Sequence, residues 1–146
     1  MKLAWLMWIS TILPHPVAEQ TCLATMVYLE ARSESTLGQL AVAEVALRRR
    51  DRGRWGHDVC AVVKAPGQFA VTTTPPGYDL GNPDAWQKAW DVAGRALTIW
   101  SKPAGKRKQV VPNADHFVAA DSPTSPAWVN GPPLATIGGH NFYRIN

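Results

Sequence analysis

The chain has 146 residues, 46% of them hydrophobic and 18% charged, and its formal net charge at pH 7 is +4. This length fits one domain with a real core, and the charged fraction lies below the ordinary value of about 25%, which argues against intrinsic disorder. No stretch approaches the roughly 20 apolar residues of a membrane-spanning helix, so a polytopic membrane protein is excluded.

The first eighteen residues resemble an export signal. Lys2 is followed by an uncharged apolar run at 3–13 and by a proline-containing segment at 14–18 that breaks any helix. One basic residue, a short apolar run and a small residue near its end are typical of a secretory signal peptide. We therefore expect residues 1–18 to be a signal peptide or signal anchor, and residues 19–146 to be the catalytic domain. Two alternatives stay open, an N-terminal core helix of the mature fold and a retained, reversible membrane anchor.

Two longer helices are predicted in the first half of the domain. Apolar residues recur at helical spacing over 20–32, which predicts a helix with one apolar face. A second helix is expected to begin at Thr36, because Thr36 and Gln39 have the spacing of a capping box. This helix runs into an arginine-rich segment at 48–54, where glycines interrupt it. The short apolar segment at 58–64 fits a helix or a strand.

The second half of the chain combines one helix with loops and short strands. Residues 65–83 are rich in proline and glycine, which predicts a loop. Asn82 is a good helix cap and is followed by proline, so we expect a helix from there to just before Pro103. Its tryptophans fall on one stripe, which indicates core packing. Residues 116–119 and 141–145 are typical of short strands, with a Pro/Ser/Gly-rich loop between them.

Cys22 and Cys60 are the only cysteines. In an oxidising compartment they can form one disulfide, which would close a loop of about 38 residues and add about 3–4 kcal/mol of stability. Two buried free thiols are the alternative. Two cysteines without a CxxC pattern cannot build a four-cysteine zinc site, and we expect neither a metal nor another cofactor.

Glu30 stands out as a candidate catalytic residue, because the apolar stripe of the helix at 20–32 ends in this carboxylate. Burying an ion there costs several kcal/mol unless it is paired or its pKa rises. A carboxyl that stays protonated near neutral pH is what a general acid needs. Two other interpretations stay open. Glu30 could pair with Arg32 or an arginine of the 48–54 segment, or it could lie where the helix emerges into solvent.

Three blocks occur in a characteristic order: Tyr-Leu-Glu-Ala-Arg-Ser-Glu-Ser at 28–35, Pro-Gly-Gln-Phe at 66–69 and Ile-Gly-Gly-His-Asn-Phe-Tyr-Arg at 137–144. Together they resemble the SleB-type cell wall hydrolases, which include spore-cortex-lytic and phage endolysin-like peptidoglycan lytic enzymes. The resemblance implies an α+β, predominantly helical, lysozyme-like (lytic transglycosylase-like) single domain with a small β-hairpin or sheet. It also places the catalytic glutamate of the family at Glu30.

The resemblance implies cleavage of the glycosidic bond between N-acetylmuramic acid (MurNAc) and N-acetylglucosamine (GlcNAc). In a lytic transglycosylase, Glu30 would serve as both general acid and general base and leave a 1,6-anhydro end. A hydrolytic muramidase or glucosaminidase would need a second carboxylate at about 5–5.5 Å (retaining) or about 6.5–9.5 Å (inverting). Glu34, Asp115 and Asp121 are the candidates for it. A non-catalytic envelope-binding module is the remaining alternative.

Around the acid we expect residues that bind the glycan. Gln68 can hydrogen-bond an N-acetyl group or a sugar hydroxyl, and the aromatic residues offer flat faces with polar tips. His116 can orient the substrate or Glu30. The expected substrate-binding set is Tyr28, Glu34, Gln68, Phe69, His116, Trp128, His140 and Tyr143.

The basic residues at 48–54 and 106–108 raise the question of nucleic-acid binding. The export signal and the absence of a recognition-helix pattern argue against it. The charges would steer the protein toward stem-peptide carboxylates or anionic lipid. Alternatively, the arginines simply lie in solvent at a helix end and compensate its negative dipole end. We expect peptidoglycan glycan strands as partner, a transient membrane contact through the N-terminal segment, no nucleic acid and a monomer. The expected location is the periplasm or cell envelope (the host periplasm if phage-encoded), as a phage endolysin or periplasmic autolysin.

Overall fold

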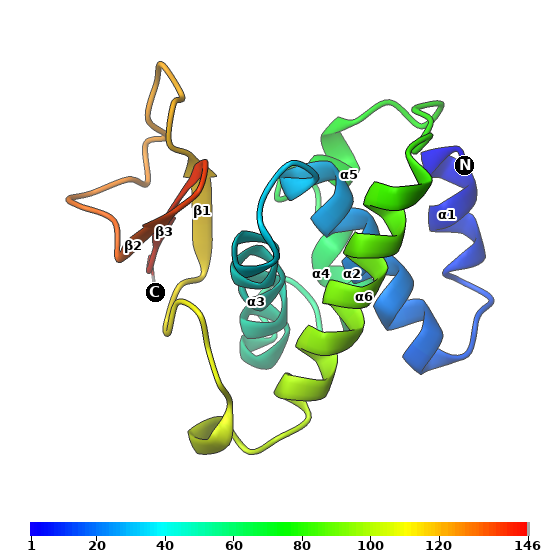
Figure 1. Cartoon of the computed structure of the whole chain (residues 1–146), viewed down its shortest axis with the longest axis horizontal. Helices are drawn as coiled ribbons and strands as arrows, with labels where there is room; N and C mark the ends of the chain where they lie inside the picture. The colour runs from blue at the N-terminus through cyan, green and yellow to red at the C-terminus, as the bar shows by residue number, and fades with distance from the viewer. Residues whose placement is uncertain (146) are drawn as a thin grey trace.

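The computed structural model describes residues 1–145, and it places a small sheet beside a body of helices (Figure 1). The helices are α1 (Leu3–Ile9), α2 (His15–Ala31), α3 (Thr36–Arg52), α4 (Val59–Val63), α5 (Ala70–Thr73) and α6 (Pro83–Trp100), followed by a 3-10 turn at Ala104–Lys106. The strands are β1 (His116–Ala119), β2 (Ala135–Ile137) and β3 (His140–Tyr143). The predicted α+β, predominantly helical fold class is confirmed.

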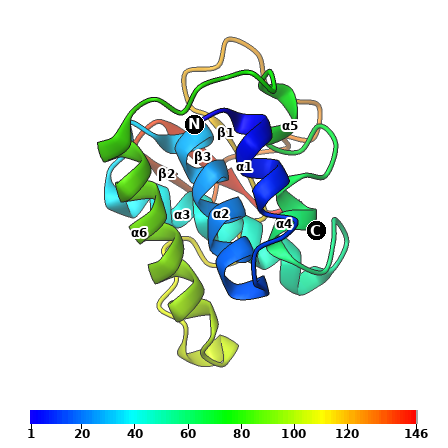
Figure 2. The same ribbon diagram turned by 90° about the vertical axis from the view of Figure 1, so that its right-hand side faces the viewer.

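Helix α2 lies inside the helical body, with α1, α3, α4, α5 and α6 packed on it. Figure 2 shows α6, α2 and α1 side by side, with the sheet behind them. Consecutive residues such as Cys22, Leu23 and Ala24 have no exposed surface. The prediction of one apolar face was therefore wrong, because a helix enclosed on all sides needs no polar face. Helix α2 also begins earlier than predicted, since Pro16 fits its first turn, where no N–H partner is needed.

The ends of α3 and α6 are set by local capping. The Ser35 hydroxyl accepts a hydrogen bond from the Gly38 N–H at 3.2 Å, so the cap of α3 is Ser35 and not the predicted Thr36. Gly53 ends α3 with φ +69°, a left-handed conformation that favours glycine. Asn82 caps α6 as predicted.

The sheet is antiparallel with strand order β1-β3-β2. Phe142 in β3 lies between Phe117 of β1 and Ala135 of β2. Strand β2 falls in the segment predicted as loop, and α5 falls in the predicted loop at 65–83. Both elements are too short to show a periodic pattern, and tertiary contacts hold them in place.

The N-terminal segment packs on the helical body. Leu3 and Leu6 of α1 are 2% and 3% exposed. A cut after Ala18 would take away α1 and the first turn of α2, and removal of residues 1–18 stays a prediction. No helix within residues 1–145 is long and apolar enough to cross a membrane.

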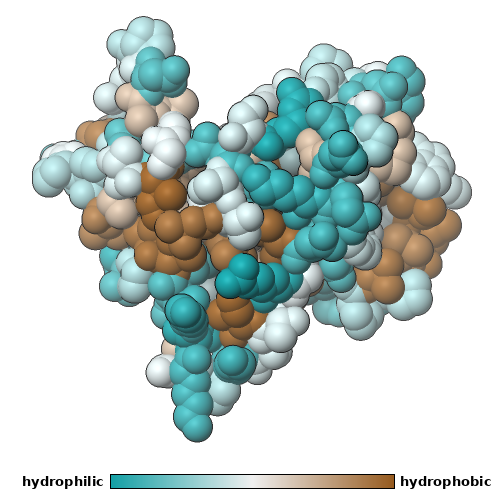
Figure 3. Space-filling model, in the orientation of Figure 1, coloured by the Kyte–Doolittle hydropathy of each residue, from teal (hydrophilic) through white to brown (hydrophobic). Residues whose placement is uncertain are grey.

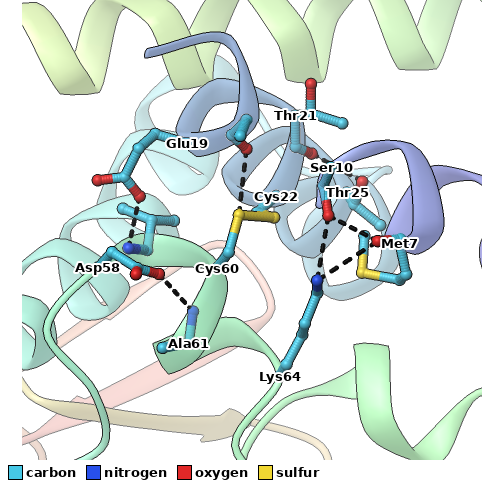
Figure 4. The surroundings of a disulfide bond; sticks show 12 residues. Met7, Ser10, Glu19, Thr21, Cys22, Thr25, Asp58, Cys60, Ala61 and Lys64 are labelled. Atoms are coloured by element: carbon cyan, nitrogen blue, oxygen red, sulfur yellow. Dashed lines mark hydrogen bonds between the residues drawn. A yellow bond between two sulfur atoms is a disulfide. The ribbon is translucent and has the colours of Figure 1, made fainter. Parts of the chain in front are cut away.

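A disulfide joins α2 to α4 in the same region, between Cys22 and Cys60 (Figure 4). Its two Cα atoms lie 5.2 Å apart. Asp58 caps α4 by accepting a hydrogen bond from the Ala61 N–H at 2.7 Å, so the segment at 58–64 is a helix.

Candidate active site

Glu30 occupies the last turn of α2, half-buried. Its Oε1 accepts a hydrogen bond of 2.6 Å from the backbone N–H of Ala70, at the start of α5. Burial raises the pKa of the Glu30 carboxyl above its ordinary value, and this effect outweighs the Ala70 hydrogen bond and the nearby charge of Arg49. The carboxyl therefore keeps its proton to higher pH than an exposed glutamate, as a general acid requires.

Two hollows bear on this carboxyl, one lined by Glu30 itself and one lined by the neighbouring Arg49. The smaller, of about 200 Å³, is lined by the end of α2, including Tyr28, Glu30 and Glu34, and by Tyr78. The larger is a cleft of about 450 Å³ whose walls come from α3, the loop before α5, the sheet and the C-terminal loops. It is lined by Arg49, Arg54, Trp55, Gly67, Gln68, His116, Phe117, Trp128 and Ile145.

Arg49 connects the cleft to the acid. Its Nε donates to the backbone oxygen of Asp115 at 2.8 Å, and its Nη1 donates to Gln68 Oε1 at 3.2 Å. The guanidinium lies 4.7 Å from the ring centroid of Trp55 and 4.6 Å from that of Phe69. Burial lowers the pKa of Arg49 to about 10, so it stays a cation at neutral pH and favours the ionised form of the neighbouring acid.

Glu34 ties the turn between β2 and β3 to the end of α2. Its Oε1 accepts a 2.8 Å hydrogen bond from the Gly139 N–H. Gly138 has φ +55°, and a Cβ added there would overlap the same carboxylate, so only glycine fits. His140 Nδ1 lies 3.9 Å from Glu34 Oε1, so the imidazole and this carboxylate are neighbours. Burial lowers the pKa of His140, which keeps the ring neutral at neutral pH.

Asp115 is fully buried and serves the structure of the cleft wall. Its carboxylate pairs with Arg52, accepts from the Ile145 N–H at 2.8 Å and lies 2.9 Å from His116 Nδ1. A carboxylate with no exposed surface cannot activate a water molecule in the cleft. Of the three candidates for a second catalytic carboxylate, Glu34 is the one that lines the same hollow as Glu30.

Residues 33–143 match the family model of the cell wall hydrolases. The chain belongs to the cell wall hydrolase family. This match begins just after Glu30, so the assignment of the acid depends on the geometry described above. Family membership makes the protein an enzyme of the cell wall. Peptidoglycan as its substrate and an envelope-associated location outside the cytoplasm are both consistent with this family.

Two solved structures are similar to this cell wall hydrolase. The catalytic domain of the germination-specific lytic transglycosylase SleB from Bacillus anthracis is 28% identical with a TM-score of 0.68, over 86% of this chain and 93% of that one. The catalytic domain of the Bacillus cereus SleB protein is 26% identical with a TM-score of 0.63, over 86% and 89%. Among curated proteins none matches. The structural similarity confirms the predicted lysozyme-like fold.

The structure separates the predicted substrate-binding residues of this hydrolase into three groups. Tyr28 and Phe69 are 1% and 4% exposed, so their rings shape the walls and offer no open face for a sugar. Tyr143 is also buried, with its ring centroid 5.6 Å from that of Trp128. The side chains of Gln68, His116 and Trp128 reach the large cleft, while Glu34 and His140 lie at the turn beside the acid.

Several residues of the cleft were not predicted from the sequence, among them Arg49, Arg54, Trp55 and Phe117. Trp55 could have been identified from its position between two glycines directly after a helix. A large aromatic side chain there has few neighbours in the sequence to pack against, so it must contact another part of the fold. His116 lies between Trp55 and Trp128, at 5.9 and 4.9 Å between ring centroids, and is oriented by the neighbouring Asp115.

The arginine-rich segment is not simply a solvated helix end. Arg48 and Arg49 are 7% and 3% exposed, and both donate to backbone oxygens of the segment before β1.

No group of three or more His, Cys, Asp or Glu within the described residues 1–145 is arranged to hold a metal ion.

Proposed function

We propose that this cell wall hydrolase cleaves the MurNAc–GlcNAc bond of peptidoglycan as a lytic transglycosylase, with Glu30 as its single acid–base group. The observation that carries the proposal is the Glu30 carboxyl itself, half-buried, held by the Ala70 N–H and with its pKa raised by burial. Similarity to a lytic transglycosylase catalytic domain from Bacillus anthracis supports the same reaction class.

The reaction needs no external nucleophile. Protonated Glu30 donates its proton to the oxygen that links MurNAc C1 to GlcNAc, and the C1–O bond breaks. The resulting Glu30 carboxylate takes the proton of the MurNAc C6 hydroxyl while that oxygen attacks C1. The products are a GlcNAc hydroxyl end and a 1,6-anhydro-MurNAc end, and Glu30 returns to its protonated form.

The large cleft suits a glycan strand with acidic substituents. Gln68 and His116 offer hydrogen bonds, and Trp128 offers part of a flat ring surface for a sugar. Arg49 and Arg54 give the same cleft a positive wall, which complements the carboxylates of lactyl groups and stem peptides.

Hydrolysis with Glu34 as a second carboxylate is the competing candidate, because Glu34 and Glu30 line one hollow. Against it, one Glu34 oxygen is already bonded to the Gly139 N–H, an arrangement that fits a structural tether. Removing the charge of Glu34 therefore distinguishes the two reactions.

The deciding experiment is mass spectrometry of the soluble fragments released from purified peptidoglycan. We expect muropeptides one water lighter than hydrolysis products, and a loss of about 10²–10⁴-fold in rate for Glu30→Gln. Glu34→Gln, the matched control, should still release anhydro ends. Hydrated ends that disappear in both variants would assign hydrolysis with two carboxylates, and absence of any fragment from the folded wild-type protein would indicate a binding module.

We further propose that the protein is exported and acts as a monomer in the periplasm, as a phage endolysin or an autolysin. The uncharged run at 3–13 and the Cys22–Cys60 disulfide support export, since such bonds persist in oxidising compartments. We favour retention of residues 1–18 over their removal, because Leu3 and Leu6 are buried in the core of the domain. The N-terminal sequence of the protein recovered from the periplasm tests this.

A further inference from the structure

Helix α1 has an inner face that is firmly attached to the domain. Leu3, Leu6 and Ser10 are buried on it. The Lys64 ammonium group, beside α4, donates to the Ser10 hydroxyl at 3.1 Å and to the Met7 carbonyl at 3.4 Å (Figure 4). The Leu3 N–H donates to the Tyr78 carbonyl at 2.9 Å. The orientation of α1 about its own axis is therefore set by the fold.

The outer face of the same segment is apolar and open to solvent. Trp5 is 48% exposed, Trp8 59% and Ile12 64%. Within residues 1–145 the exposed large hydrophobic side chains are Met1, Trp5, Trp8, Ile12, Val17, Leu37 and Leu134, and the first five of them precede residue 18. We call these five residues the α1 patch. Figure 3 shows apolar side chains gathered over α1 at the right edge of the molecule. Large exposed apolar side chains gathered in one region mark an interaction site.

We propose that the α1 patch docks on the surface of an anionic lipid bilayer. Tryptophan beside long aliphatic side chains suits the membrane–water interface, because its apolar ring can enter the lipid while its N–H remains hydrated. A helix with an apolar outer face lies in the interface plane without spanning it.

The charges around the α1 patch favour anionic lipid over a neutral surface. Residues 1–18 contain Lys2 and neither aspartate nor glutamate. The nearby Asp79 is paired with the terminal amino group at 2.6 Å, and Lys64 adds a positive charge beside the helix. The formal net charge of the whole chain, +4, acts in the same direction.

The position of the α1 patch leaves the cleft free in the docked state. Helix α1 lies at the end of the molecule away from the sheet (Figure 1), and residues of β1 line the large cleft. A molecule held to a membrane by α1 would thus turn its cleft away from the lipid. This inference does not depend on the proposed reaction, because it concerns a surface that takes no part in the chemistry.

The test is co-sedimentation of the full chain with phosphatidylglycerol–phosphatidylethanolamine vesicles. We expect wild-type protein to bind, and Trp5→Ser/Trp8→Ser to weaken the apparent lipid affinity by about tenfold or more, since two large apolar contacts are lost. Leu37→Ser/Leu134→Ser is the matched control, because these leucines are 54% and 53% exposed elsewhere and should bind as wild type. Glu30→Gln should also bind as wild type, which separates this test from that of the reaction.

A second measurement works without substitutions at the patch. Trp5 and Trp8 are the most exposed tryptophans among the described residues, so vesicles should shield part of the wild-type fluorescence from acrylamide. Failure of wild-type protein to bind vesicles, equal binding to purely zwitterionic vesicles, or unchanged binding of a folded Trp5→Ser/Trp8→Ser protein would each overturn the proposal. A wild-type dimer that ignores vesicles and dissociates on the same substitutions would assign the patch to a second copy.

Discussion

The helical body and the C-terminal part are held together by different forces. Around α2 the contacts are apolar and close-packed, and residues such as Leu23 and Val27 have no exposed surface. The segment after α6 is instead attached to α3 by buried charged side chains. Glu44 accepts the N–H groups of Val110 and Val111, and Arg48 and Arg49 donate to the chain just before β1.

This difference matches what each region has to do. Apolar packing gives a large stabilisation without direction, which suffices to hold the helix that carries Glu30. The cleft wall must present His116 and Trp128 at a set distance from that helix, and charge-assisted hydrogen bonds define direction as well as energy. We therefore expect that replacing the charged residues of α3 by apolar ones disturbs the structure of the cleft more than that of the helical body.

Glu44→Ala should have the largest effect on stability. The substitution removes the carboxylate paired with the buried Arg48, which keeps its hydrogen bonds to the Ala114 carbonyl and to Gln109. It also leaves the N–H groups of Val110 and Val111 unpaired, and together such losses cost about 3–5 kcal/mol. The free energy of unfolding from urea titration measures it. Leu23→Ala is the control for the helical body, and it should cost about 2–5 kcal/mol while leaving the fluorescence of the cleft tryptophans native-like. A cost below about 1 kcal/mol for Glu44→Ala would contradict the difference between the two regions.

Removing the disulfide tests the helical body alone. Cys22→Ala/Cys60→Ala opens a link across 38 residues and should lower stability by about 3–4 kcal/mol, because the unfolded chain gains freedom. Urea titration with and without reductant measures the loss, and wild-type protein under reductant should match the double variant. The fluorescence of Trp55 and Trp128 reports on the cleft, and far-UV circular dichroism reports on the helices. A fluorescence change at a lower urea concentration than the loss of the dichroism signal would show that the two regions unfold separately.

The smallest expected effect concerns Glu30, the proposed catalytic acid, in the last turn of α2. The pKa of Glu30 is raised in the folded protein, so the folded state holds this proton more tightly than the unfolded chain. That contribution is fully present below the ordinary pKa of 4.5 and is lost as the pH rises through the folded-state value. Relative to Glu30→Gln, the wild-type protein should therefore lose stability between pH 4.5 and neutral pH. Parallel Tm–pH curves for the two proteins would show that Glu30 is not buried as described.

Elements with a strong local pattern were predictable. The helices α3 and α6 follow from apolar spacing and from capping residues such as Asn82, since these signals lie within a few residues of one another. The same reasoning placed Glu30 near the end of a helix, and the structure has it in the last turn of α2. It failed for the environment of α2, because spacing along one helix does not reveal how many neighbours cover it.

By itself the sequence determined the helical class and the likeness to cell wall hydrolases, because each is carried by short local patterns whose residues lie close together in the chain. Only the tertiary structure decided that Glu34 binds the turn at Gly139, 105 residues away, and that Asp115 is sealed off from the cleft. It also decided that α1 packs on the domain with its tryptophans outward. Such pairings arise from the packing of distant segments, which determines which polar groups are buried and which partners they meet.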